Sequence, residues 1–210
     1  MDKVLKNSIW LFAIYLFLFL IHPEIDYRFS AIFFDGSFVE KGANLETFIY
    51  DSVDILSIIL FLFLGILLIL VLKNGGVYFG VFDKKSLVFL LTFFILTSGL
   101  VVNMTLKEFS GRARPSKVVQ FGGDQQLTPP LLKAYECSNH NCSFSSGHSV
   151  LAFGIAVFAL LFPMYKNRIF FAALFYGILV SIARIAQGGH FLSDTLFSFF
   201  TVLFSMQLLF

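Results

Sequence analysis

Three short clusters of basic residues, histidines and one aspartate lie in the C-terminal half of the chain. They are Lys107 with Arg114 and Pro115, then Ser146-Gly147-His148, and then Arg184 with His190 and Asp194. Breaking a phosphate ester requires cations to offset the phosphate charge, a nucleophile to attack phosphorus and an acid to protonate the departing oxygen. The clusters contain residues suited to each of these roles. They therefore predict a phosphoryl-transfer site.

The first cluster combines two cations with a proline. Lys107 and Arg114 are seven residues apart, so their side chains would lie two turns apart on one helical face if a helix continued through both. Pro115 would end that helix, because proline lacks the amide hydrogen and restricts the residue before it. Both cations would then bind one phosphate. Alternatively, they form a basic collar at a membrane surface together with Arg112 and Lys117.

The second cluster directly precedes an apolar run. A helix that begins at Ser146-Gly147-His148 would present unpaired amide hydrogens and a partial positive charge there. The backbone amides of Ser146 and Gly147 are therefore expected to bind phosphate. The alternative is an ordinary helix cap by Ser145 or Ser146, with His148 solvated at the interface.

The third cluster brackets a short turn. His190 and Asp194 are four residues apart, so the carboxylate would reach the imidazole if a helix began by His190. Such a carboxylate fixes the tautomer of a nucleophilic histidine and stabilises its positive charge. Gly188 and Gly189 would allow close approach of the backbone. The alternative is an interfacial ion pair.

The composition indicates an integral membrane protein. Of 210 residues, 58% are hydrophobic, 13% are charged and 30 are phenylalanines, and the mean hydropathy is +0.85. A formal net charge of only +2 gives little support to a nucleic-acid partner. We predict an all-α fold with six transmembrane helices in a single domain, residues 1–210. The expected spans are Ser8–Ile21, Ile55–Leu72, Ser86–Leu106, Ser149–Tyr165, Ile169–Ala183 and Leu192–Phe210.

The basic residues of the loops predict the orientation of these spans. Lysines and arginines away from the proposed site all fall on one side, which should be cytoplasmic; they are Lys3, Lys6, Lys73, Lys84, Lys85, Lys166 and Arg168. Both termini are then cytoplasmic, and the three clusters face the periplasm together with the acid-rich segment His22–Asp54. A signal peptide is the alternative for the first span, but no small-residue cleavage site follows it.

The two cysteines, Cys137 and Cys142, lie in the loop assigned to the periplasmic side. An oxidising compartment favours a disulfide between them. Cys137, His140, Cys142 and His148 are also zinc-ligand types. Their spacing fits no common zinc pattern, and a zinc site would remove His148 from catalysis.

Taken together, Lys107-x6-Arg114-Pro115, Ser146-Gly147-His148 and Arg184-x5-His190-x3-Asp194 resemble the three-part signature of the type 2 phosphatidic acid phosphatase (PAP2) superfamily. Two positions depart from its commonest pattern, since Ser145 stands where proline is usual and Ala183 where serine is frequent. The loop from Gln120 to His148 is similar to that of bacterial lipid A phosphatases, especially the 4'-phosphatase group.

The resemblance implies a mechanism and a location. It makes His190 the nucleophile that forms a phosphohistidine, Asp194 the group that holds its ring, and His148 the acid and later base. Lys107, Arg114 and Arg184 clamp the phosphate with the amides of Ser146 and Gly147. No metal or other cofactor is expected, because the cations already supply the positive charge. Arg112 is expected to contact a headgroup or to face water.

The expected enzyme is a bacterial inner-membrane phosphatase whose partners are the bilayer and a phosphorylated lipid. Lipid A is the preferred substrate, with undecaprenyl pyrophosphate and phosphatidylglycerophosphate as alternatives. A transporter is disfavoured, because the ionisable residues lie at span ends and not at mid-membrane. A lipid-binding protein without activity is the remaining alternative. The sequence does not indicate the oligomeric state.

Overall fold

The computed structural model describes residues 3–42, 44–134, 137 and 142–209. Within this part of the chain the elements are helical, and only isolated β-bridges occur. The longer helices are α1 (Lys3–Ile21), α2 (Glu24–Ala31), α3 (Leu45–Asn74), α4 (Lys84–Phe94), α6 (Gly147–Gly154), α8 (Lys166–Ala186) and α9 (Leu192–Leu209). The all-α prediction is confirmed for the described residues.

Short helical segments connect these helices. A π-helical segment, Ile95–Leu106, continues α4 into α5 (Lys107–Ser110), and 3₁₀ turns cover Pro115–Lys117 and Val119–Phe121. A 3₁₀ turn (Ile155–Val157) joins α6 to α7 (Phe158–Leu161), and another (Pro163–Tyr165) leads into α8. The sequence predicted that Lys166 and Arg168 lie in a loop between two spans. They lie instead in the first turn of α8.

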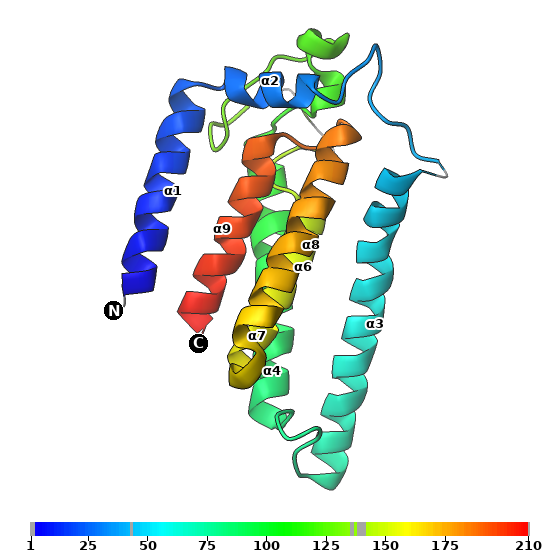
Figure 1. Cartoon of the computed structure of the whole chain (residues 1–210), viewed down its shortest axis with the longest axis vertical. Helices are drawn as coiled ribbons and strands as arrows, with labels where there is room; N and C mark the ends of the chain where they lie inside the picture. Colours follow the sequence, from blue (N-terminus) through cyan, green and yellow to red (C-terminus); the bar gives the residue numbers. More distant parts are fainter. Residues whose placement is uncertain (1–2, 43, 135–136, 138–141, 210) are drawn as a thin grey trace.

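The helices run side by side, with α2 lying across one end of them and both termini pointing away from that end (Figure 1). Three described helices are long and apolar enough to cross a membrane: Leu45–Asn74, Pro163–Ala186 and Leu192–Leu209. Leu5–Ile21 and Glu24–Ala31 pass the same test as a pair bent by 86°. Gly147–Leu161 is apolar but shorter. The helices overlap all six expected spans, but α3 begins at Leu45 and not at Ile55. At most four of the six satisfy this length criterion.

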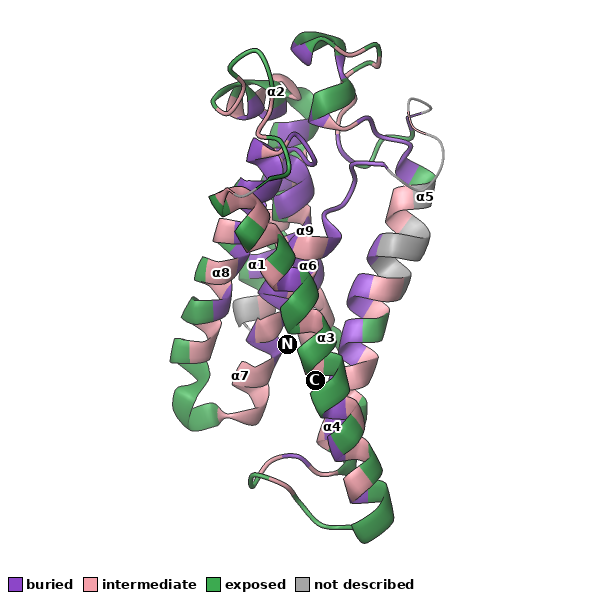
Figure 2. Ribbon diagram, turned by 90° about the vertical axis from the view of Figure 1, so that its right-hand side faces the viewer, coloured by how far each residue is buried: buried purple, intermediate pink, exposed green. Residues whose placement is uncertain are grey.

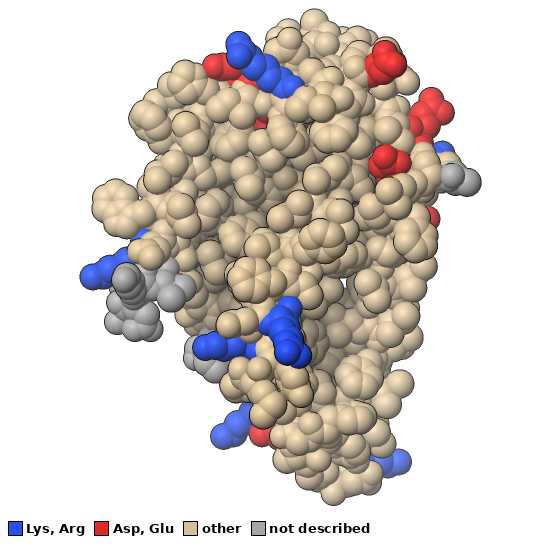
Figure 3. Space-filling model, viewed as in Figure 1, with Lys and Arg blue, Asp and Glu red and all other residues tan. Residues whose placement is uncertain are grey.

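The outer surfaces of these helices are apolar. On α3 the exposed side chains include Ile58, Leu62 and Ile69, each about 60% exposed. A broad uncharged surface lies between the charged residues at the upper end of the molecule and the lysines and arginines of its lower half (Figure 3). Large exposed apolar surfaces of this kind mark contact with lipid or a partner, and a helix satisfies its own backbone hydrogen bonds in a bilayer.

Close packing holds the central helices together. A Cβ atom added to Gly177 of α8 would lie 2.1 Å from Cδ1 of Phe153 on α6, so only glycine allows this approach. Around this contact, Phe93, Leu87, Leu90 and Val157 are completely buried. Buried residues are concentrated towards the end where α2 lies, and exposed residues follow α3 (Figure 2). The more buried end of the bundle is therefore the one that carries the polar clusters.

The helix through Lys107 ends earlier than the sequence predicted. Gly111 adopts the left-handed conformation (φ 56°) directly after Ser110, and Arg114 is extended (φ −81°, ψ 154°). Glycine is the usual residue for such a helix end. The prediction that Lys107 and Arg114 share one helical face is therefore wrong, and Pro115 begins a 3₁₀ turn instead of ending the helix.

Candidate active site

A cavity of about 830 Å³ lies at the end of the bundle where α2 lies. Its lining includes Lys107, Arg114, His148, Arg184 and His190. These residues come from α5, the loop after it, α6, α8 and the α8–α9 turn. The structure therefore brings together five of the eight residues assigned to the site. Ser146, Gly147 and Asp194 lie behind this lining, and all three are buried.

Four cations line this cavity: Lys41, Lys107, Arg114 and Arg184. Burial lowers the pKa of Arg114. The guanidinium of Arg184 lies 4.7 Å from the centre of the Tyr50 ring and donates from Nη1 to Oε1 of Gln187 at 2.6 Å. Its Nε is buried and has no hydrogen-bond partner among the described residues. A bound phosphate would offset this concentration of charge.

The imidazole of His190 is 2% exposed. Its Nδ1 lies 2.6 Å from the carbonyl oxygen of Ser143 and 3.9 Å from Oδ2 of Asp194. A carbonyl oxygen only accepts, so Nδ1 carries the hydrogen and Nε2 keeps its lone pair. The direct partner is thus the Ser143 carbonyl and not the Asp194 carboxylate. The reason is that α9 begins at Leu192, two residues later than the predicted geometry required.

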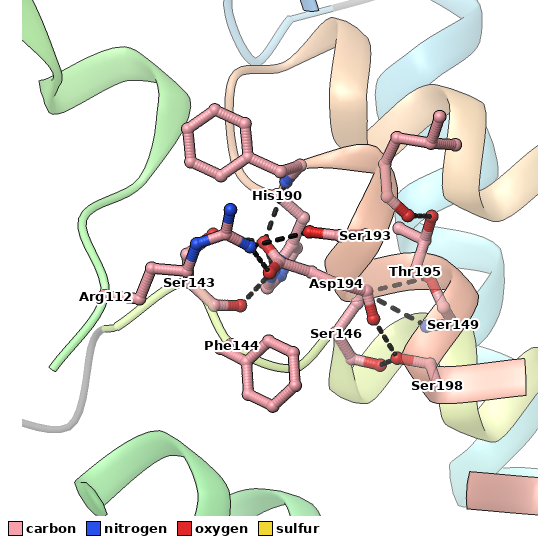
Figure 4. A network of polar contacts seen from close by, with 12 residues as sticks. Arg112, Ser143, Phe144, Ser146, Ser149, His190, Ser193, Asp194, Thr195 and Ser198 are labelled. Atoms are coloured by element: carbon pink, nitrogen blue, oxygen red, sulfur yellow. Dashed lines mark hydrogen bonds and ion pairs between the residues drawn. The ribbon is translucent and has the colours of Figure 1, made fainter. Parts of the chain in front are cut away.

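Asp194 instead belongs to a buried network (Figure 4). Its carboxylate pairs with Nη1 of Arg112 and accepts from Oγ of Ser143 at 2.5 Å and from the amide of Phe191 at 2.8 Å. Arg112 also binds Oδ2 of Asp26 at 2.7 Å through Nη2. Asp194 therefore fixes the segments that carry Ser143 and His190, without being the first partner of the imidazole.

The expectation for Arg112 is wrong. Its side chain is 1% exposed, and the Asp26 and Asp194 carboxylates that flank it are completely buried. Burial alone would lower the pKa of the guanidinium, but these two carboxylates raise it. An arginine buried between two carboxylates faces neither water nor a lipid headgroup.

Ser146 caps α6. Its Oγ accepts from the amide of Ser149 at 3.3 Å, and its carbonyl accepts from Oγ of Ser198 at 3.0 Å. The side chain of Ser146 is therefore an ordinary N-cap, which was the alternative to phosphate binding. The first turn of α6 places His148 on the cavity, where its ring stacks on Tyr50 at 4.3 Å between centres. Nε2 of His148 lies 3.2 Å from Oδ1 of Asp54.

The sulfur atoms of Cys137 and Cys142 are bonded to each other, with 5.5 Å between their Cα atoms. His140, which the zinc alternative requires, lies outside the described residues. Among the residues that are described, no group of three His, Cys, Asp or Glu side chains is arranged to hold a metal ion.

Several residues of the site were not found from the sequence. Asp26 is one of several acids in the segment His22–Asp54, Tyr50 belongs to the same segment, and Ser143 contributes only a backbone carbonyl. Tyr50 stacks on His148 and faces Arg184, and the ammonium of Lys41 lies 4.3 Å from its ring centre. No local spacing signals these roles, because each depends on a contact between segments far apart in sequence.

A known protein family matches the part of the chain that contains the three clusters. Residues 87–210, which include all three clusters, match the PAP2 superfamily. The chain belongs to the PAP2 superfamily. The resemblance noted in the sequence is therefore confirmed.

Known relatives of this PAP2 protein include two lipid A 4'-phosphatases. That of Francisella tularensis subsp. novicida is 32% identical over 187 residues, covering 85% of this chain and 82% of the relative. That of Rhizobium leguminosarum is 28% identical over 200 residues, covering 88% and 85%. The crystal structure of a PAP2 type phosphatidylglycerolphosphate phosphatase from Bacillus subtilis superposes with a TM-score of 0.63 at 21% identity, covering 96% and 93%. This last likeness shows that the two PAP2 proteins share a fold.

Proposed function

We propose that this PAP2 protein is a membrane lipid phosphatase that hydrolyses a phosphate monoester of a lipid headgroup through a phosphohistidine. The observation that carries the proposal is the single cavity that gathers His190, His148 and three cations. An imidazole with a free Nε2, beside several phosphate-binding cations, is suited to nucleophilic attack on phosphorus.

In the first step Nε2 of His190 attacks phosphorus, the ester P–O bond breaks, and His148 gives its proton to the leaving oxygen. In the second step His148 takes a proton from water, the resulting hydroxide attacks phosphorus, and the P–N bond breaks. Lys107, Arg114 and Arg184 offset the charge of the phosphoryl oxygens in both steps. The products are the dephosphorylated lipid and inorganic phosphate.

The same proposal extends to topology. We infer six spans. The helical run 84–110 and Gly147–Leu161 do not meet the length criterion, and Leu5–Ile21 meets it only together with Glu24–Ala31. Successive helices run in opposite directions, and the cavity lies at the end away from the termini. Lys73, Lys84, Lys85 and Lys166 lie near the other end, as expected for the cytoplasmic side of an inner membrane. The cavity then faces the periplasm.

Lipid A is the proposed substrate, because the two relatives named above are lipid A 4'-phosphatases. The test is phosphate release by detergent-purified protein from lipid A, undecaprenyl pyrophosphate and phosphatidylglycerophosphate in parallel, with EDTA present. We expect release from lipid A to be fastest and insensitive to EDTA. A preference for another lipid would make that lipid, and not lipid A, the proposed substrate. No release from any lipid would refute the enzyme and favour a lipid-binding protein.

Replacing Gly189 with alanine should displace a phosphate-binding cation. The new Cβ would lie 2.5 Å from Nη2 and 2.9 Å from Cζ of Arg184, so the guanidinium must move. We expect kcat/KM for phosphate release to fall roughly tenfold to a hundredfold, with little change in Tm. Gly65→Ala is the matched control, since no atom lies within 4 Å of its new Cβ. An unchanged rate in Gly189→Ala would show that the position of Arg184 does not matter.

The pH dependence should reflect the surroundings of His190. Burial and the charges of Arg184, Arg114 and Lys107 hold its pKa well below the usual value. The attacking imidazole must be neutral, so it stays competent as the pH falls below 6.5 and protonates only at a lower pH. Lys107→Gln removes one of these charges and raises that pKa. We therefore expect the acid limb of the normalised kcat/KM profile to move to higher pH. An acid limb that stays in place would contradict this.

A further inference from the structure

The cavity is much larger than a phosphate group needs. Its volume of about 830 Å³ lies within the range of pockets that enclose a whole small molecule. Lys107, Arg114, Arg184 and the two histidines form one part of its lining. A different set of residues forms the rest of the lining, and this set is not used by the mechanism.

Three phenylalanines make up much of this second side. Phe34, Phe38 and Phe121 line the cavity, and their ring centres lie 4.9 to 5.1 Å apart. Tilted contacts at such distances hold aromatic rings in place. The three residues come from two segments, the α2–α3 connection and the 3₁₀ turn Val119–Phe121. We call them the aromatic wall.

The aromatic wall lies next to the reacting histidine. The amide of Val39 donates to the carbonyl of Ala186 at 3.0 Å, which fastens the α2–α3 connection to the end of α8. The ring of Phe38 packs on Gly188, where an added Cβ would be 2.5 Å from its Cδ2. Gly188 is two residues before His190. A group attached to the phosphate therefore has the aromatic wall beside it.

Polar groups accompany the wall. Oε1 of Gln187 accepts from Arg184, which orients the amide, and Nε2 of Gln187 is buried with no hydrogen-bond partner among the described residues. Buried donors normally have a partner, so a ligand hydroxyl or carbonyl oxygen would complete this one. Glu40 and Lys41 also line the cavity. An acyl chain would leave the buried amide of Gln187 without a partner.

A pyranose ring matches both features, because it has apolar C–H faces and a rim of hydroxyl or amide groups. We infer that the part of the cavity beside the aromatic wall binds the sugar ring that carries the phosphate. This makes the enzyme selective for phosphoglycolipids over glycerol-based lipid phosphates, with Phe38 and Gln187 as specificity-determining residues. The inference rests on the proposed function and deepens it.

Binding measurements test the subsite without requiring turnover. Calorimetric titrations of the His190→Ala protein in detergent would compare glucosamine 4-phosphate, glycerol 3-phosphate and inorganic phosphate. We expect the sugar phosphate to bind about tenfold more tightly than glycerol phosphate, the scale of an aromatic contact. In His190→Ala/Phe38→Leu this preference should disappear, while inorganic phosphate binds as before. Equal affinities for the two esters in His190→Ala would overturn the inference.

Two further measurements separate a sugar contact from a structural role. Phe38→Leu with intact His190 should lower kcat/KM for lipid A about tenfold and that for phosphatidylglycerophosphate less than about twofold. Phe171→Leu, on a side chain 65% exposed on α8, should change neither. Equal losses for both lipids would mean that Phe38 only supports the fold. If Phe38→Leu does not fold, Phe34→Leu replaces it under the same criteria.

The outcomes distinguish the two proposals. A protein that releases no phosphate from any lipid, yet prefers the sugar phosphate in titrations, has the subsite without the proposed activity. A protein that hydrolyses lipid A but shows no preference for the sugar ring has the activity without the subsite.

Discussion

His190→Ala should lose phosphate release from lipid A by at least about a thousandfold, because it removes the atom proposed to attack phosphorus. The loss should appear in kcat, with lipid binding retained, since Lys107, Arg114 and Arg184 remain in the cavity. His22→Ala is the matched control. That histidine is exposed, pairs with Glu24 at 2.9 Å, and should have no effect on the rate.

The covalent intermediate provides a second readout of the same prediction. Wild-type protein quenched in alkali after mixing with labelled lipid should carry phosphate on a histidine, and His190→Ala should carry none. If His148 activates water, His148→Ala should accumulate the phosphoenzyme whenever a good leaving group allows it to form. Full activity of His190→Ala, or labelled phosphate bound covalently to that variant, would refute the phosphohistidine mechanism.

Arg112→Ala should lose stability as well as activity. It would leave two buried carboxylates, Asp26 and Asp194, without their shared cation. Removing one partner of a buried ion pair typically costs about 3 to 5 kcal/mol, which for a chain of this size corresponds to a fall in Tm on the order of 10 °C. Thermal unfolding in detergent, followed by loss of helical signal, measures it. Arg28→Ala, on an exposed arginine of α2, should change Tm by no more than a few degrees.

Comparison with Arg114 separates a buried structural cation from one that binds phosphate. Arg114→Ala should reduce the rate on the order of a hundredfold with a smaller change in Tm than Arg112→Ala. Asp26→Asn should lie between wild type and Arg112→Ala in Tm, because Arg112 keeps Asp194 as its partner. If Arg112→Ala kept its Tm and lost only activity, Arg112 would be a headgroup contact, as first expected from the sequence.

The positions of the polar clusters and the apolar spans could be predicted because both are local patterns. Runs of apolar residues mark helices that can cross a membrane whatever they pack against. Residues such as Ser146 and His148 lie at the edge of such a run, so their place at the end of a helix follows from sequence order. The end of the helix through Lys107 was less certain, as Gly111 shows, because one left-handed residue changes which side chains can meet.

The sequence by itself therefore determined the family, the helical architecture and the set of residues that we propose for the chemistry. Only the tertiary structure decided which groups meet. Arg112 binds Asp26, which is 86 residues away in the sequence, and Nδ1 of His190 donates to the Ser143 carbonyl, which is 47 residues away. A charged side chain is buried only where a counter-charge is already in place, and that condition is set by packing between distant segments. Local spacing alone contains no information about it.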